Sequence, residues 1–245
     1  MKFFTPPNFP LLDRYLIATT LTNHPHANEG FNLAKNPNQS PEQRASIEAN
    51  RQKLQSALPP NTTPLWLTQT HSDIIHTLKT YHPESPADAL ISYSREKMPI
   101  VLTADCIPAL IADEQGEIWG AVHAGWQGVY QCILPKTIKA MQISPKRLWV
   151  YLAPSITQKN YEIDTPFYQR FINLDPSYEK AFTPNRPEHY LADLPHIAKL
   201  QLLEAGVPEK QIYQSALCSF EDTRLFSYRR DKALSGRMAS FITPR

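Results

Sequence analysis

The sequence predicts an α+β (mixed α/β) fold in which mixed sheets are flanked by helices, with a single domain over residues 1–245. Three observations support this prediction. Short apolar runs recur at close spacing between residues 64 and 123. Helical patterns precede and follow these runs without strict alternation, and no linker rich in Pro, Gly or Ser divides the chain.

The N-terminal part contains few periodic apolar positions. Residues 12–20 suit one strand, and residues 23–38 are predicted to form a loop. A helix is predicted over residues 41–58, with Ser40 as its N-cap and Pro41 as its first residue, and the two prolines that follow would end it. Because its apolar face is thin, we expect this helix at the surface.

The central apolar runs predict six strands of a sheet, over residues 65–67, 74–78, 87–92, 99–103, 107–112 and 118–123. A turn is predicted at Glu114–Glu117, between the last two runs. Further strands are predicted over residues 148–153, 211–217 and 241–242, and helices over residues 129–141, 167–174 and 191–205.

Composition disfavours several classes of protein. The chain has 25 Lys and Arg against 23 Asp and Glu, which gives no reason to expect a surface for nucleic acid or anionic membranes. The longest apolar stretch, residues 98–112, contains Asp105 and two prolines and is too short to cross a bilayer, and residues 1–7 do not resemble a signal peptide. Three widely spaced cysteines disfavour a disulfide framework, so we expect a cytoplasmic protein.

Glycine is scarce, with 7 Gly against 23 Pro, yet Gly120, Gly125 and Gly128 fall within nine residues. Gly125 and Gly128 flank a loop after His123, where they would permit a positive φ and close approach of a ligand to the backbone. The N–H groups at the start of the following helix could hold a phosphate. An ordinary tight turn explains the same pattern equally well.

Three chemically capable side chains follow apolar runs: His71, Cys106 and His123. Two imidazoles and one thiolate suit Zn²⁺ and leave a fourth position for water or substrate. The spacings of 35 and 17 residues are not those of a zinc finger, so the fold would have to assemble the site. Cys106 and His123 could instead be the nucleophile and base of a hydrolase without metal, or all three could be ordinary packed residues.

A laccase-type copper cluster needs about ten His and Cys ligands. The chain has 8 His and one His-x-His pair, His24-Pro25-His26, so a cluster of this kind is implausible, although a single copper could occupy the His/Cys site. Near the C-terminus, Arg229, Arg230 and Arg237 offer guanidinium groups that could bind phosphate, although solubility is the simpler explanation for any one of them.

Taken in order, these motifs closely resemble the YfiH type of laccase-domain-containing proteins, once described as polyphenol oxidases. The resemblance runs from about residue 31 to the C-terminus. The matching stretches are Phe31-Asn32-Leu33, Asn50-Arg51, Gln69-Thr70-His71, Ala87-Asp88-Ala89-Leu90, Thr103-Ala104-Asp105-Cys106-Ile107-Pro108, His123-Ala124-Gly125-Trp126-Gln127-Gly128, Ala153-Pro154-Ser155-Ile156, Tyr161-Glu162, Phe226-Ser227-Tyr228-Arg229-Arg230 and Gly236-Arg237.

The resemblance implies a zinc site at His71, Cys106 and His123, with copper possible in the same place. It implies phosphorolysis of adenosine, inosine and methylthioadenosine, with adenosine deamination as a side activity. The small-molecule partners would be a nucleoside and phosphate. The protein would be a monomer or a weak homodimer. Three alternatives stay open: an amidase that edits peptidoglycan precursors through Cys106 and His123, a partner-binding protein with structural zinc, and, least favoured, a copper-dependent polyphenol oxidase.

Neighbouring residues are expected to assist. Asp105, beside Cys106, could shuttle a proton or orient His71, although a carboxylate that only bonds the backbone at a strand end would explain it equally well. The substrate-binding candidates are Arg51, Gln69, Gly125, Arg229 and Arg230. Two departures from the family pattern affect substrate preference. Residues 19–25 replace a stretch similar to basic-Gly-Gly-Val-Ser, and Gln127 stands where Arg is usual, which removes a positive charge.

Overall fold

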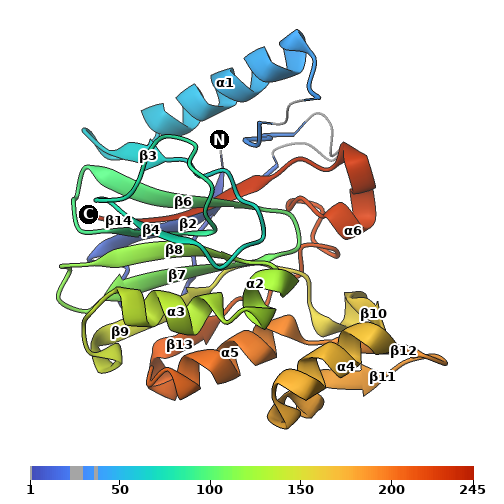
Figure 1. Ribbon diagram of the computed structural model, residues 1–245. Helices are drawn as coiled ribbons and strands as arrows, with labels where there is room; N and C mark the ends of the chain where they lie inside the picture. Colours follow the sequence, from blue (N-terminus) through green and yellow to red (C-terminus); the bar gives the residue numbers. More distant parts are fainter. Residues whose placement is uncertain (1, 23–29, 36–37) are drawn as a thin grey trace.

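Two β-sheets lie face to face at the centre of the protein, and helices cover the outer face of each sheet (Figure 1). The structure is a computed structural model that describes residues 2–22, 30–35 and 38–245. The layers are α1 (Pro41–Ser56), a five-stranded sheet, a six-stranded sheet, and α3 (Ile133–Ala140) with α5 (Leu194–Glu204). This arrangement confirms the predicted α+β class.

The five-stranded sheet brings the two ends of the chain together. In sheet order its strands are β1 (Phe3–Phe4), β2 (Tyr15–Thr20), β14 (Met238–Pro244), β6 (Lys97–Thr103) and β3 (Thr63–Leu65). The C-terminal β14 is antiparallel to both β2 and β6, and β3 is parallel to β6. The strand predicted from residue 12 begins only at Tyr15, because the backbone N–H groups of Arg14 and Tyr15 close a turn on Leu11.

Helix α1 begins where the sequence predicts. The Ser40 side chain accepts a hydrogen bond from the Gln43 backbone, the Gln43 side chain bonds back to Ser40, and Pro41 is the first helical residue. Leu54 of this helix and Leu58 beyond it pack on the five-stranded sheet. Ile47 and Asn50 are buried as well, and most other residues of the helix face solvent, as its thin apolar face predicts.

The six-stranded sheet carries the segments that form the site. In sheet order its strands are β13 (Ile212–Gln214), β9 (Leu148–Leu152), β7 (Ile107–Asp113), β8 (Trp119–Ala124), β5 (Ala89–Ser92) and β4 (Ile75–Thr77). Strands β7 and β8 form an antiparallel hairpin whose predicted turn is confirmed by a φ of 78° at Gly116. Buried side chains between the two sheets include Tyr15, Leu110 and Trp119.

The helix predicted over residues 129–141 is wrong in its extent. Two helices occur there, α2 (Trp126–Tyr130) and α3, because Cys132 between them adopts a left-handed conformation with a φ of 59°. Helix α3 packs its buried face, including Ile133 and Ile138, against the core under the six-stranded sheet.

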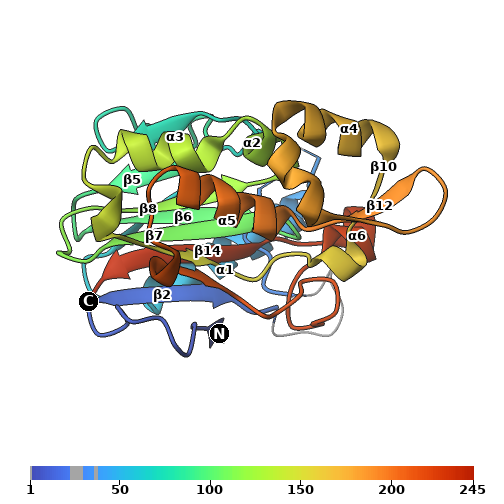
Figure 2. The ribbon, with the colours of Figure 1, turned by 90° about the horizontal axis from the view of Figure 1, so that it is seen from below.

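The helix predicted over residues 191–205 also needs correction. Residues 189–192 form a strand, and α5 begins at Leu194, because the Asp193 side chain caps it by accepting from the His196 backbone. Figure 2 shows α3 and α5 lying across the outer face of the six-stranded sheet.

A smaller three-stranded sheet lies to one side, next to α4 (Thr165–Leu174), which Asp164 caps. Its strands, in sheet order, are β10 (Glu162–Asp164), β12 (His189–Ala192) and β11 (Phe182–Pro184). The remaining helices are α6 (Tyr228–Asp231) and the 3₁₀ turns η1 (Pro145–Arg147), η2 (Gln158–Asn160), η3 (Pro176–Ala181), η4 (Glu209–Gln211) and η5 (Lys232–Leu234).

Two sequence predictions concern residues that the structure leaves undescribed. The pair His24-Pro25-His26 lies outside the described residues, as does much of the loop predicted over residues 23–38. Within the described part of the chain, no helix combines the length and the apolar character that a membrane span requires.

Candidate active site and metal centre

His71, Cys106 and His123 come together at one end of the six-stranded sheet. Cys106 immediately precedes β7, and His123 lies in β8 opposite Pro108, so the antiparallel hairpin places the two residues at the same end. His71 comes from the loop between β3 and β4. The three ligand atoms lie within 4.8 Å of one another, and the Cys106 Sγ is 3.8 Å from the His71 Nε2.

A buried carboxylate, Asp88, organises this centre from behind. Its Oδ1 is 2.7 Å from the His123 Nδ1 and also accepts the His71 backbone N–H, while its Oδ2 accepts the N–H groups of Thr70 and Ser72 and the Ser72 hydroxyl. Burial raises the pKa of Asp88, but the hydrogen bond and charge of His123 and the bonds from Ser72 lower it to about 2. Asp88 therefore stays ionised and fixes both histidines.

The donor set fits a zinc ion. With its Nδ1 on Asp88, His123 turns its Nε2 toward the cluster, which is the carboxylate–histidine–metal arrangement common in zinc proteins. One thiolate and two imidazoles are ligands that Zn²⁺ accepts, and three protein ligands are typical of a catalytic rather than a structural site. Copper(I) also accepts thiolate and imidazole, so the donor set admits it at the same position.

Electrostatics favour a thiolate at Cys106. Burial raises the pKa of this thiol, but the charge of His123 and the hydrogen bonds from His123 and His71 lower it to about 6. For His123, burial lowers the pKa, but the charge of Cys106 and the bond to Asp88 raise it to about 9. The thiolate that a metal or a nucleophilic mechanism requires is therefore favoured at neutral pH.

Gly125 touches two of the three ligands. A Cβ at this position would lie 2.7 Å from the His71 Cδ2 and 3.3 Å from the Cys106 Sγ, so only glycine leaves room for both side chains. The predicted positive φ is wrong, because Gly125 has a φ of −67° and serves as the N-cap of α2. Its backbone approaches the ligands themselves, and it does not line the cavity described next.

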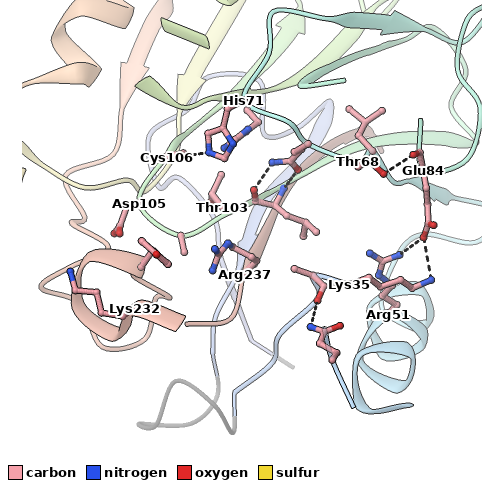
Figure 3. Close-up of a pocket in the computed structure, with 18 of the residues that line it drawn as sticks. Lys35, Arg51, Thr68, His71, Glu84, Thr103, Asp105, Cys106, Lys232 and Arg237 are labelled. Atoms are coloured by element: carbon pink, nitrogen blue, oxygen red, sulfur yellow. Dashed lines mark hydrogen bonds and ion pairs between the residues drawn. The ribbon is translucent and has the colours of Figure 1, made fainter. Parts of the chain in front are cut away.

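A cavity of about 1440 Å³ opens in front of the three ligands (Figure 3). Near the ligands it is lined by Asp105, Tyr161, Tyr228, Arg229 and Arg237, and farther away by Lys35, Arg51, Glu84 and other residues around α1. No residue of α2 lines it, so the helix start that the sequence suggested as a possible phosphate site lies outside this cavity. Gln127 is exposed on α2, and the charge that the family usually has there would lie outside this cavity.

Asp105 does not contact His71. Its Oδ1 accepts the Ser219 hydroxyl at 2.6 Å and its Oδ2 accepts the Arg229 backbone N–H at 2.6 Å. The residue has a φ of 87°, a strained conformation for a residue other than glycine. The expected role in orienting His71 is therefore corrected: Asp88 holds the histidines, and Asp105 connects the segment before Cys106 to the start of α6.

The five substrate-binding candidates take different places. Arg51 lines the far part of the cavity, where it lies 3.9 Å over the Trp66 ring and 3.6 Å from Glu84. Gln69 also lines the cavity, but its amide exchanges two hydrogen bonds with the Leu102 backbone, at 2.7 and 2.6 Å. Both side chains are therefore already held by protein groups.

Arg229 and Arg230 diverge although they are adjacent. Arg229 lines the cavity, donates to the Glu162 carbonyl and lies 5.2 Å over the Tyr161 ring. Arg230 donates to the carbonyls of Ser219, Phe220 and Leu225 and pairs with Asp231, so protein groups already hold its guanidinium, and it does not line the cavity.

Sequence reasoning overlooked Asp88 as a functional residue. The signal was a single carboxylate inside the apolar run of residues 87–92, because a buried carboxylate needs hydrogen-bond or charge partners. The strand in this run begins at Ala89, two residues later than predicted, and the Asp88 carboxylate just before it binds the loop that carries His71. Tyr161 and Tyr228, which belong to two of the longer motifs, line the cavity with aromatic side chains.

Comparisons with known proteins place the chain in a family and agree with this fold. The sequence model of the family described as "Multi-copper polyphenol oxidoreductase laccase" matches residues 21–245. A Xylella fastidiosa protein named purine nucleoside phosphorylase is 34% identical over 201 residues, which cover 79% of this chain and 77% of the relative. An Escherichia coli protein named purine nucleoside phosphorylase YfiH is 33% identical over 198 residues, 80% of each chain.

Solved structures show the same fold. The Neisseria meningitidis protein NMB0706 superposes with a TM-score of 0.84 at 30% identity, covering 100% of this chain and 99% of its own. YlmD from Geobacillus stearothermophilus gives a TM-score of 0.87 at 24% identity, over 99% of this chain and 98% of its own, which extends the likeness in fold.

Proposed function

The chain belongs to the multi-copper polyphenol oxidoreductase laccase family, which contains the YfiH type, and from this premise we propose that it is a zinc-dependent purine nucleoside phosphorylase. Its proposed substrates are adenosine, inosine and methylthioadenosine, with adenosine deamination as a side activity. The relatives named purine nucleoside phosphorylase support this reaction class.

One observation carries the proposal. His71, Cys106 and His123, with Asp88 hydrogen-bonded to His123, lie at a cavity of about 1440 Å³. Aromatic and guanidinium side chains line this cavity. A nucleoside has a flat base, which stacks on aromatic faces, and phosphate is a ligand that guanidinium groups bind well. The cavity is larger than the several hundred Å³ typical of sites for one small ligand, so it has room for a nucleoside together with phosphate.

The ligand set argues against laccase chemistry. Among the described residues, His71, Cys106 and His123 are the single group that could hold a metal ion through three or more His, Cys, Asp or Glu side chains. A multicopper oxidase needs several such groups. We therefore propose a mononuclear centre, with zinc as its metal and copper as the alternative occupant.

In phosphorolysis, a phosphate oxygen bonds to C1′ of the ribose while the bond from C1′ to the purine nitrogen breaks. His71, Cys106 and His123 would hold zinc, which would supply Lewis-acid polarisation of a bound oxygen. Asp88 keeps His123 in one tautomer, and Gly125 leaves space for His71 and Cys106. Tyr161 would position the base.

Paired histidine variants test this proposal. His71→Ala removes one ligand and should abolish zinc binding and lower phosphorolysis of inosine by at least about 100-fold. His76→Ala is the control, because this histidine lies on β4 away from the cavity, and its side chain hydrogen-bonds to Thr80. Unchanged zinc content and unchanged turnover in His71→Ala would reject the proposed centre.

A second function is favoured by one specific observation. Cys106, His123 and Asp88 are arranged as nucleophile, base and orienting carboxylate, and the low pKa of the thiol suits nucleophilic attack. The alternative is therefore an amidase that removes an amino acid from a muramic-acid precursor. Hydrolysis of such a precursor that resists a chelator and needs no phosphate would favour this alternative over the phosphorylase.

A further inference from the structure

Arg237 presents a guanidinium group to the cavity without a carboxylate partner. The residue immediately precedes β14, and its backbone is fixed because its N–H donates to the Asn32 side chain at 2.8 Å. Its Nη1 donates to the carbonyls of Ser235 and Gly236, and its guanidinium lies 5.7 Å from the Tyr228 ring. Within the described part of the chain, no Asp or Glu lies within ion-pair distance of it.

The anionic neighbours of Arg237 already bind other groups. Burial lowers the pKa of Arg237, and the charges of Cys106 and then of Asp105 raise it by less; the Cys106 thiolate is a ligand of the proposed metal centre. Both carboxylate oxygens of Asp105 already accept hydrogen bonds, from Ser219 and from the Arg229 backbone. By contrast, Arg51 in the far part of the same cavity has a carboxylate, Glu84, at 3.6 Å. Arg237 is therefore a half-buried cation that still needs an anion.

Thr103 supplies a second, independent observation in the same wall. It is the last residue of β6, it lines the cavity, and its side chain is 1% exposed, yet its hydroxyl has no hydrogen-bond partner among the described residues. A buried hydroxyl without a partner costs about 1–3 kcal/mol, and because Thr103, unlike Thr243, also lines the cavity, a bound ligand could supply its missing partner.

The sheet register places the two residues next to each other in the fold. Thr103 pairs with Met238 across β6 and β14, and Arg237 directly precedes Met238. Figure 3 shows both side chains in the part of the cavity that also contains His71 and Cys106. A guanidinium and a hydroxyl at one wall are hydrogen-bond donors that together suit a tetrahedral oxyanion.

We infer that Arg237 and Thr103 form the subsite that holds the phosphate co-substrate, an inference that rests on the proposed phosphorylase function. Arg237 donates two hydrogen bonds to phosphate oxygens and supplies the compensating charge, and the Thr103 hydroxyl donates a third. The phosphate is then held on the side of the cavity that faces the metal ligands. Neither residue is required for binding the base.

The test uses three variants of the full-length, zinc-loaded protein. Thr103→Val removes the hydroxyl without changing the size of the side chain, Arg237→Met removes the charge, and Arg237→Lys keeps the charge but loses the planar fork. The KM for phosphate in inosine phosphorolysis should rise at least tenfold in Arg237→Met and about three- to tenfold in Thr103→Val, with Arg237→Lys between wild type and Arg237→Met. The KM for inosine should change less than twofold.

The chain offers a matched control for each variant. Thr243→Val removes another fully buried hydroxyl that has no partner among the described residues, but Thr243 is in β14 and does not line the cavity. Both threonine variants should keep or raise the melting temperature, and only Thr103→Val should change the KM for phosphate. Arg224→Met removes an exposed guanidinium paired with Asp222 and should leave both KM values unchanged.

Binding of inorganic phosphate, measured by isothermal titration calorimetry, separates this inference from the phosphorylase proposal. If wild-type protein makes no ribose 1-phosphate, the proposed function fails, but binding of phosphate that is lost in Arg237→Met still supports the subsite. Failure of the wild-type protein to bind phosphate overturns the subsite. An unchanged affinity or KM for phosphate in both Thr103→Val and Arg237→Met overturns it as well.

Discussion

Asp88→Asn is the substitution that tests the organisation of the metal centre most sharply. The change keeps the size of the side chain but removes its charge and one of its two acceptor oxygens. In the wild-type protein one oxygen faces the His123 Nδ1 and the His71 backbone N–H, and the other faces the N–H groups of Thr70 and Ser72. Whichever way the amide turns, its NH₂ group meets donors on one side, and at least one buried N–H loses its acceptor.

The size of the effect follows from this geometry. Breaking a buried charged pair destabilises a protein by about 3–5 kcal/mol. For a chain of this length, such a loss lowers the Tm by roughly 6–20 °C. Removing the carboxylate behind a ligating histidine weakens metal binding by about 10–100-fold. Asp88→Asn should therefore reduce both stability and zinc affinity.

The assay combines thermal unfolding with a zinc titration against a competing chelator. Asp73→Asn is the control, because this carboxylate lies on the same loop but forms an ion pair with Lys136 near the surface. That pair should contribute less than about 1 kcal/mol. A zinc Kd and a Tm in Asp88→Asn that match the wild-type values would refute the role assigned to Asp88.

Three further outcomes are expected. The pKa of Asp88 is lowered from 3.8 to about 2, so its contribution to stability is full above pH 3.8 and is lost as the pH falls toward 2. The acid limb of the Tm–pH curve should therefore be steeper in wild-type protein than in Asp88→Asn. Gly125→Ala would push a methyl group to within 2.7 Å of the His71 ring and should weaken zinc binding about tenfold, with an unchanged circular dichroism spectrum. Gln69→Ala removes two hydrogen bonds from the Leu102 backbone and should lower the free energy of unfolding by about 1–3 kcal/mol, measured with urea, with little change in the KM for inosine.

Each of these outcomes has a contrary result. Parallel Tm–pH curves for the two proteins would mean that Asp88 does not titrate as described. Gln127→Ala, at an exposed position of α2, is the control for Gly125→Ala, and equal zinc affinity in the two variants would show that His71 adapts to the added methyl group. A raised KM for inosine in Gln69→Ala, with unchanged stability, would indicate that Gln69 contacts the substrate directly.

Local signals in the sequence were enough to predict much of the fold. The start of α1 follows from Ser40 and Pro41, and the turn between β7 and β8 follows from Gly116. These features depend on residues a few positions apart, which is the range over which capping and turn chemistry act. The helix break at Cys132 was missed, because cysteine in a left-handed conformation has no sequence signal.

The site was predicted only in part, because its contacts are between distant segments. His71, Cys106 and His123 could be nominated by their positions after apolar runs, and the structure brings them together. The role of Asp88 as the partner of His123 could not be predicted, because it depends on β5 lying beside β8 and on how the loop with His71 folds over Asp88.

The arginines show the same limit. Arg230 and Arg237 carry the same group near the C-terminus, yet the guanidinium of Arg230 is occupied by carbonyls and Asp231, while Arg237 faces the cavity. What a guanidinium binds depends on where the chain places its acceptors, and the sequence pattern contains no information about that placement.

The central claim is tested most directly by incubating purified, zinc-loaded protein with inosine, with and without inorganic phosphate, and measuring hypoxanthine and ribose 1-phosphate. The account predicts that the two products form in equal amounts, only when phosphate is present, and that neither forms with His71→Ala. Hypoxanthine released with free ribose at the same rate without phosphate, or no turnover by protein shown to contain zinc, would contradict the account.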